Sequence, residues 1–242
     1  IVDRIYIGRI PLEGKLALTG MGVTFPVITL ISAFPALVGM GGAPRASIAL
    51  GAGEKDRAER TLGTCATALW GIAAALTVLF LLFQRDLLRL FGASVDTLPY
   101  AMQYLSIYVL GTIFVMTALG LNGFITAQGS SAVAMKTVVI GAVLNVVLDP
   151  LFIFVLHMGV RGAALATVLS QICSTAYILR FLLGGKAAVG ITRQPVNPGW
   201  MRRIVQVGLS PAMIIALDNV LLISVNVMLR KYGGADSDML IA

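Results

Sequence analysis

The residue best placed to do chemistry in this sequence is Asp149, an acid well inside a long apolar stretch. A charged side chain at the centre of a lipid bilayer costs at least about 2.5–3.5 kcal/mol. Such a group persists where it faces a water-filled cavity, has a partner, or takes up a proton. An acid in this position therefore indicates a functional site, and a purely structural polar clamp between helices is the alternative.

The neighbours of Asp149 support a cation site. Asn145 precedes it by four residues in the segment Asn145-Val-Val-Leu-Asp149-Pro150, so the two side chains share one face of a helix. The amide oxygen of Asn145 can coordinate a cation, and its NH2 group can donate to a carboxylate. Pro150 removes one backbone donor and loosens the helix beside the acid. Carboxylate, amide and weakened helix together suit a site for a proton or a sodium ion.

The elements that position these residues are transmembrane helices. The chain is 58% hydrophobic and 12% charged with a mean hydropathy of +0.92, whereas soluble domains carry roughly 25% charged residues. Uncharged runs cover residues 16–44, 61–84 and 97–135, and a helix needs about 20 apolar residues to cross a bilayer. The runs are continuously apolar and do not alternate as barrel strands do. We therefore expect an all-α polytopic membrane protein.

The expected helices cover residues 1–10, 16–44, 57–84, 95–125, 132–157, 160–184 and 199–231. Gly39, Gly41 and Gly42 are expected to allow close helix packing. The long polar connection 185–198 is the expected linker between a unit at 1–184 and a second unit that begins at 199–242. The chain lacks an initiator Met and opens directly in apolar sequence, so we expect a fragment whose first helix is truncated.

The formal net charge of +7 does not indicate nucleic acid, because the basic residues gather near helix ends without interleaved aromatic residues. Membrane lipids with anionic headgroups are the simpler partner. A slight excess of Lys and Arg on the side of the 185–198 linker favours a cytoplasmic position for that side.

Two segments resemble the multidrug and toxic compound extrusion (MATE) family: Asn145-Val-Val-Leu-Asp-Pro-Leu-Phe-Ile-Phe154 and Met158-Gly-Val-Arg-Gly-Ala-Ala-Leu-Ala-Thr-Val-Leu-Ser-Gln171. Further similar segments, in the same order, are Gly39-Met-Gly-Gly42, Ser47-Ile-Ala-Leu-Gly-Ala-Gly53, Ala127-Gln-Gly129 and Gly208-Leu-Ser-Pro211. The resemblance implies a twelve-helix transporter with two six-helix lobes, in a bacterial or archaeal inner membrane. This chain looks like the N-lobe, with helix 1 truncated, plus helix 7 of the C-lobe.

The resemblance also implies the members of the cation site. Asp149 resembles the helix 5 aspartate of that site, and Asn145 resembles its neighbouring asparagine. Thr167 matches the helix 6 threonine whose hydroxyl completes the site, and Asp3 resembles a helix 1 aspartate facing the same cavity. The implied ligand of these residues is H+ or Na+, without another cofactor.

Other positions are secondary candidates. Asp218, inside the predicted helix 199–231, is either a second coupling or substrate-contact acid or a polar group at the lobe interface. Asn226 is a further candidate contact on the same helix. Pro26 and Pro150 are expected to bend their helices.

The expected function is export of cationic amphipathic drugs or toxic compounds in exchange for H+ or Na+, by alternating access. The expected partners are these small molecules, membrane lipids and the C-lobe of the same protein. One alternative is a lipid-linked precursor flippase, whose cavity would need basic residues for phosphate groups. Another is a membrane enzyme or a non-transporting scaffold subunit. Catalysis is not expected, because the only histidine, His157, lies near a helix end and no nucleotide motif is present.

Overall fold

The computed structural model describes residues 2–10, 14–185, 187–192 and 198–232, and within these ranges the regular elements are all helices. In chain order they are α1 (Val2–Ile7), α2 (Gly14–Pro35), η1 (Ala36–Met40), α3 (Gly41–Gly51), α4 (Lys55–Leu90), α5 (Leu98–Leu110), α6 (Thr112–Ala127), α7 (Ser131–Pro150), η2 (Leu151–Val155), α8 (Gly159–Leu183) and α9 (Pro198–Tyr232). The predicted all-α fold is confirmed.

The predicted continuous helix over 95–125 is wrong, because α5 and α6 meet at an angle of 58°. The bend lies at Gly111, whose N–H is shared between the carbonyls of Ile107 and Tyr108. A Cβ at Gly111 would lie 2.5 Å from the Val168 side chain of α8. The missing side chain thus lets α8 approach the bend. Among the described residues, five helices can each cross a membrane, and the bent pair raises the number to six.

Two short π-helices, η1 and η2, directly follow prolines. Pro35 precedes η1, and Pro150 precedes η2. Proline lacks the N–H that the regular ladder requires, and π-turns are a known way to absorb such a local change, often at functional sites. The regular helix therefore ends at Pro150, directly after the acid at position 149. At Pro26, by contrast, α2 continues as one helix through the proline.

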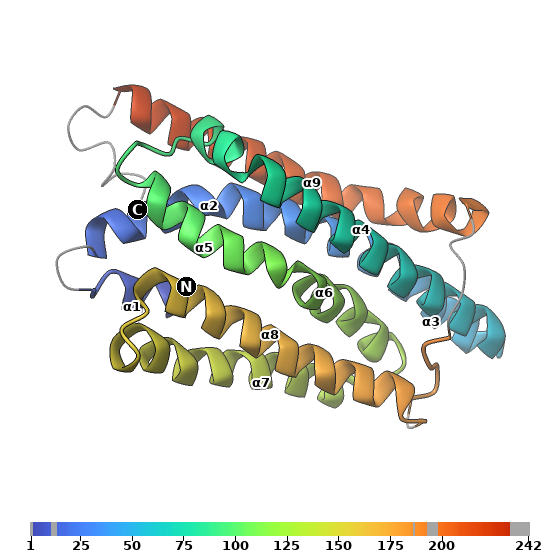
Figure 1. Cartoon of the computed structure of the whole chain (residues 1–242). Coiled ribbons are helices and arrows are strands. Elements are labelled where there is room, and N and C mark those ends of the chain that lie inside the picture. Colours follow the sequence, from blue (N-terminus) through green and yellow to red (C-terminus); the bar gives the residue numbers. More distant parts are fainter. Residues whose placement is uncertain (1, 11–13, 186, 193–197, 233–242) are drawn as a thin grey trace.

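The helices form an elongated bundle (Figure 1). α7 packs along α8, α9 packs along α2 and η1, and α4 packs along α6. The short α1 contacts α2, α7 and α8 and lies at the end of the bundle opposite residues 187–192 (Figure 1). This arrangement brings the N-terminal helix beside the acid-bearing helix α7.

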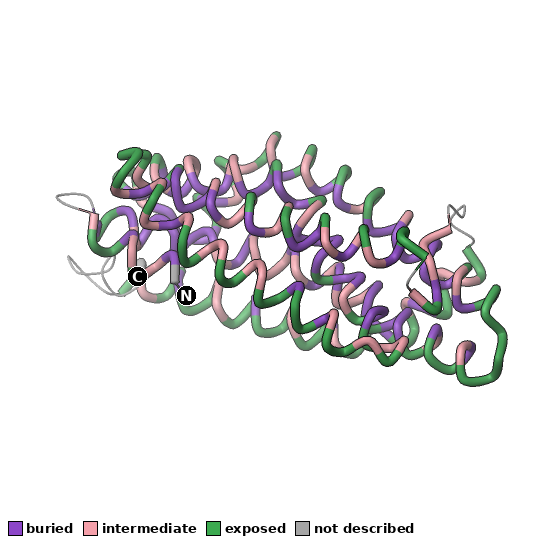
Figure 2. Tube along the Cα trace, turned by 90° about the horizontal axis from the view of Figure 1, so that it is seen from below, coloured by how far each residue is buried: buried purple, intermediate pink, exposed green. Residues whose placement is uncertain are grey.

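The outer faces of the bundle are apolar. Leu82 on α4, Val138 on α7 and Leu221 on α9 are 72%, 59% and 66% exposed. Figure 2 shows exposed residues along the outer sides of the helices and buried ones turned inward. A surface of this kind suits lipid rather than water, as expected from the composition.

Glycines allow α9 to approach the other helices at backbone distance. A Cβ on Gly208 would overlap the carbonyl oxygen of Leu37 in η1, and a Cβ on Gly41 would overlap that of Ile204. Close packing at Gly41 was expected from the sequence. α9, which follows the predicted linker, is thereby packed directly on η1 and α3.

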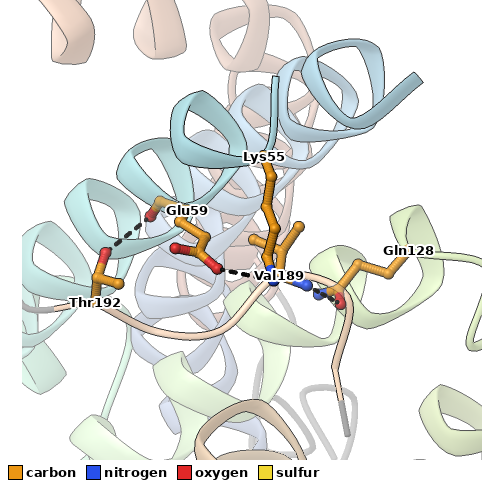
Figure 3. Close-up of polar contacts among 5 residues, drawn as sticks. All are labelled: Lys55, Glu59, Gln128, Val189 and Thr192. Carbon is orange, nitrogen blue, oxygen red and sulfur yellow. Dashed lines mark hydrogen bonds and ion pairs between the residues drawn. The ribbon is translucent and has the colours of Figure 1, made fainter. Parts of the chain in front are cut away.

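The described part of the predicted linker contacts the ends of two helices. The buried Val189 donates its N–H to Gln128 Oε1 at 2.9 Å, and Thr192 Oγ1 donates to the carbonyl of Glu59 at 3.4 Å (Figure 3). Lys55 forms an ion pair with Glu59 at 3.7 Å. Residues 187–192 therefore lie against the start of α4 and the end of α6. Residues 186, 193–197 and 233–242 of the predicted linker and second unit lie outside the described residues.

Candidate functional site

Asp3 is the centre of a hydrogen-bond network between helices. Its side chain is buried, at 8% exposure, although it lies only one position into α1. Thr167 Oγ1 of α8 donates to Asp3 Oδ2 at 2.7 Å, and the hydroxyl of Tyr104 of α5 donates to the same oxygen at 3.1 Å. Two neutral donors therefore hold one carboxylate oxygen, and they connect α1 to α5 and α8.

The network continues to α7 through Asn145. Its Nδ2 donates to Thr167 Oγ1 at 3.2 Å. The hydroxyl of Thr167 thus accepts from Asn145 while it donates to Asp3. This use of the amide NH2 leaves the amide oxygen of Asn145 available to a cation.

Asp149 is the most buried acid of the site. Its exposure is 0%, and neither carboxylate oxygen has a hydrogen-bond partner among the described residues. Its side chain turns away from lipid, and the described residues offer it no basic partner within salt-bridge distance. The carboxyl group of Asp3 is close enough to interact with it electrostatically. Two negative charges repel strongly in low-dielectric surroundings, and a proton or a metal cation removes that repulsion.

A cavity of about 410 Å³ lies against this network. Asp3, Asn145 and Thr167 line it, whereas Asp149 does not. Asp149 is therefore next to Asp3 but outside the cavity wall. Among the described residues, Asp3 is the acid that a solute in the cavity can contact.

The cavity wall is aromatic on one side and polar on the other. Tyr104 and Tyr108 line it and stack at 6.1 Å with an interplanar angle of 16°, and Phe25 of α2 adds a third ring. The polar side contains Asn122 of α6, whose Oδ1 is buried without a partner among the described residues. Aromatic faces beside a carboxylate suit an amphipathic cation.

No lysine or arginine is among the described residues that line the cavity. Arg4 follows Asp3 in the chain, but its guanidinium lies 4.0 Å from the centre of the Phe25 ring. The wall of the cavity therefore carries acid and amide groups. The positive charge of Arg4 lies against the ring of Phe25.

The two candidates on α9 lie apart from this cavity. Asp218 is exposed on the outer side of α9, where it is not among the cavity-lining residues. Asn226 is buried against the α4–α5 connection, with its side chain 3.7 Å from the position of a Cβ on Gly92. Pro26 accepts a hydrogen bond from Asn219 Nδ2 at 2.8 Å, which ties α2 to α9. The structure brings together Asp3, Asn145, Asp149 and Thr167, but neither of the α9 candidates joins them.

Sequence reasoning missed Tyr104, Tyr108 and Phe25. The signal available was the spacing of the two tyrosines by four residues in an uncharged run, which places both hydroxyls on one helix face. The spacing does not indicate which residue Tyr104 binds, because its partner Asp3 is 101 residues away in the chain.

The residues at the site fit a hard cation. Carboxylates, an amide oxygen and a hydroxyl are the oxygen ligands that such ions prefer. The unpartnered oxygens of Asp149 are the specific observation, because buried polar atoms in native proteins are nearly always satisfied. A bound sodium ion would coordinate them, and a proton would let Asp149 share a hydrogen bond with the neighbouring carboxyl group of Asp3.

Comparison with protein families gives a match over most of the chain. The MatE family model matches residues 1–151. The chain is also 26% identical over 224 residues to the multidrug export protein MepA of Staphylococcus haemolyticus, covering 92% of this chain and 50% of that protein. The chain therefore spans about half the length of the relatives it matches.

Solved structures show the same fold. An inward-facing multidrug resistance MATE family transporter of the MOP superfamily has a TM-score of 0.92 at 26% identity, covering 99% of this chain and 54% of that one. An outward-facing structure of a transporter with the same description has a TM-score of 0.85 at 27% identity, covering 98% and 52%. The arrangement of helices in this chain is thus more similar to the inward-facing structure than to the outward-facing one.

Proposed function

Because the chain belongs to the MatE family, we propose that its protein is a secondary active antiporter that exports cationic amphipathic compounds in exchange for H+ or Na+. The observation that carries the proposal is the fully buried Asp149, whose two oxygens lack donors among the described residues. It lies next to Asp3, which lines a cavity with aromatic residues. One pair of acids can then serve both the coupling ion and the cationic substrate.

The mechanism follows from competition for negative charge. With both acids ionised, Asp3 attracts a cationic compound into the cavity, and Tyr104 and Tyr108 offer ring faces to its apolar part. Entry of H+ or Na+ to Asp149 and Asp3 removes that charge and weakens substrate binding. A ligand shifts a conformational equilibrium only by its differential affinity for the two states, so loading must favour a different packing of α1 against α7 and α8.

Two features support movement at this point. α1 is joined to α5 and α8 by side-chain hydrogen bonds to Asp3, whose strength depends on the charge of that acid, and α7 passes into a π-helix directly after Pro150. Rocking of two lobes would then expose the site alternately to each side.

The concentration gradient of the coupling ion supplies the energy. When a singly charged compound leaves in exchange for one H+ or Na+, no net charge crosses the membrane, so the membrane potential makes no net contribution. A tenfold ion gradient supplies about 1.4 kcal/mol, which can sustain up to a tenfold gradient of the exported compound. The setting we propose is a bacterial inner membrane, with the 185–198 side in the cytoplasm.

The flippase alternative finds no support in the cavity. Phosphate-bearing headgroups need basic side chains, and the polar groups of the described lining are one acid, amides and hydroxyls instead. A scaffold role would not need an unpartnered carboxyl group in the membrane interior.

Efflux from vesicles tests the proposal. The intact protein is reconstituted, a fluorescent lipophilic cation is loaded, and a pH or Na+ gradient is imposed separately. We expect efflux to accelerate with one of these gradients and to stop when that gradient is collapsed. Efflux that responds to neither gradient would exclude coupled antiport.

The hydroxyl of Thr167 provides a finer prediction. Thr167→Val keeps the shape but breaks the hydrogen bonds to Asp3 and Asn145, whereas Thr167→Ser keeps both. We expect the valine variant to shift the coupling-ion concentration for half-maximal efflux by about tenfold, since a hydrogen bond to a charged group contributes about 1.5–3 kcal/mol. The shift is upward for Na+, which loses a hydroxyl oxygen, and downward for H+, because the lost bond stabilised the ionised form of Asp3. In the serine variant, the coupling-ion concentration for half-maximal efflux should stay within about threefold of that of the parent. This corresponds to a change in binding free energy below about 0.7 kcal/mol. Equal ion dependence in the two variants would show that the hydroxyl plays no part.

A further inference from the structure

A second polar concavity lies at the opposite end of the bundle from α1, between α3, the start of α4 and the start of α9. It is a groove of about 160 Å³ whose lining includes Arg45, Ile48, Arg57, Thr61 and Trp200. We call it the Trp200 groove. It lies outside the Asp3 cavity and shares no lining residue with it among the described residues.

Arg45 is the unsatisfied group of this groove. It is half-buried on α3, and its Nε is buried without a hydrogen-bond partner among the described residues. The described acids include none within salt-bridge distance of its guanidinium. A buried N–H of this kind is costly unless it finds an acceptor. A ligand in the groove could supply that acceptor to Arg45.

Arg57 and Trp200 form the other wall. Arg57 is held by Glu54 through a bond of 2.8 Å between Nη1 and Oε2. Its guanidinium carbon lies 5.9 Å from the centre of the Trp200 ring. A half-buried tryptophan beside arginines at the end of a membrane helix is typical of the headgroup level of a bilayer.

Basic residues outnumber acids around the groove, and its other side is apolar. One adjoining hollow is lined by Lys55, Arg57 and Arg60 together with Glu54 and Asp56, and another by Arg202 and Arg203 with Trp200. Glu54, which also lines the groove, is paired with Arg57. Ile48 of α3, which lines the groove itself, is 73% exposed. A ligand with a negative head and an apolar tail would match both sides.

We propose that the Trp200 groove binds an anionic phospholipid of the adjacent leaflet. The phosphate accepts from Arg45, the indole of Trp200 lies at the level of the glycerol, and an acyl chain covers Ile48. Basic pockets between membrane helices are an established way to bind anionic headgroups, and arginine is well suited to phosphate. Because α3 and α9 lie on either side of the connection 185–198 in the chain, the bound lipid would bridge the helices before and after it.

Lipid binding measured by native mass spectrometry on the intact, purified protein tests this proposal independently of transport. The probe is phosphatidylglycerol, titrated against phosphatidylcholine as the zwitterionic reference. We expect preferential retention of phosphatidylglycerol, and a loss of about tenfold in its affinity on Arg45→Gln, in line with removal of a charge-assisted hydrogen bond.

A matched control separates the groove from general surface charge. Arg180→Gln makes the same change at an exposed arginine in the last turn of α8, which does not line the groove, and it should alter the affinity less than about twofold. Trp200→Leu is the second groove variant and should also weaken binding. Size-exclusion chromatography checks that each variant is folded.

Three results would overturn the proposal. The first is unchanged phosphatidylglycerol affinity in folded Arg45→Gln or Trp200→Leu protein. The second is an equal loss in Arg180→Gln, which would assign the effect to net charge. The third is displacement of the lipid by inorganic phosphate at matched concentration, which would make the groove a site for soluble anions instead.

Discussion

Replacing Asp149 with asparagine should reduce gradient-driven efflux to the level of vesicles without protein, while the variant still inserts and folds. Asparagine has nearly the same shape but cannot take up a proton, and it offers a sodium ion no charge. Asparagine fills the same volume beside Asp3, and no N–H or O–H group of the described residues donates to Asp149, so the change removes chemistry rather than packing. The measurement is efflux of a fluorescent lipophilic cation under imposed pH and Na+ gradients, with the amount of inserted protein determined in parallel.

The control for this prediction is Asp86→Asn. Asp86 is an exposed acid near the end of α4, so the same loss of charge occurs outside the site. Its efflux should match that of the parent. Undiminished gradient-driven efflux by Asp149→Asn would remove Asp149 from the mechanism.

Gly208→Ala should prevent the bundle from forming its native packing. The added Cβ would overlap the backbone carbonyl of Leu37, and a backbone atom cannot move aside as a flexible side chain can. Overpacking in a core costs about 1–3 kcal/mol or more, and here α9 would have to leave η1 and α3. We expect a marked fall in the yield of monodisperse protein and in its thermal unfolding temperature.

Gly71→Ala is the matched control for Gly208→Ala. Gly71 lies in the middle of α4, where a Cβ would meet open space with no neighbouring atom within 4 Å. Alanine favours helix by about 1 kcal/mol over glycine, so this variant should be as stable as the parent or more so. Normal stability of Gly208→Ala would contradict the close approach of α9 to η1.

Most of the architecture could be predicted from the sequence because lipid imposes simple rules. A helix in a bilayer must satisfy its own backbone, so the uncharged runs 16–44 and 61–84 correspond closely to parts of α2–α3 and α4. The resemblance to the MATE family is confirmed by the match over residues 1–151. The bend at Gly111 could not be predicted, because it depends on the contact with Val168 of another helix.

The candidate cation site was predictable in part. An acid at position 149 in an apolar run is a strong signal by itself, and Asn145 shares its face. Asp3 lies near the start of the chain and has no long apolar run before it, so only the family resemblance indicates that it faces the same cavity. The structure places it in the wall of the cavity with Tyr104 as an additional donor, a contact between helices distant in the sequence.

Equilibrium binding of a fluorescent lipophilic cation to the purified, intact protein, measured over a range of pH and Na+ concentration, tests most directly whether one pair of acids serves ion and substrate in turn. Our account predicts that the apparent Kd rises in proportion to the concentration of one of the two ions, and that Asp149→Asn removes this dependence. An apparent Kd that stays the same at every pH and Na+ concentration would contradict it.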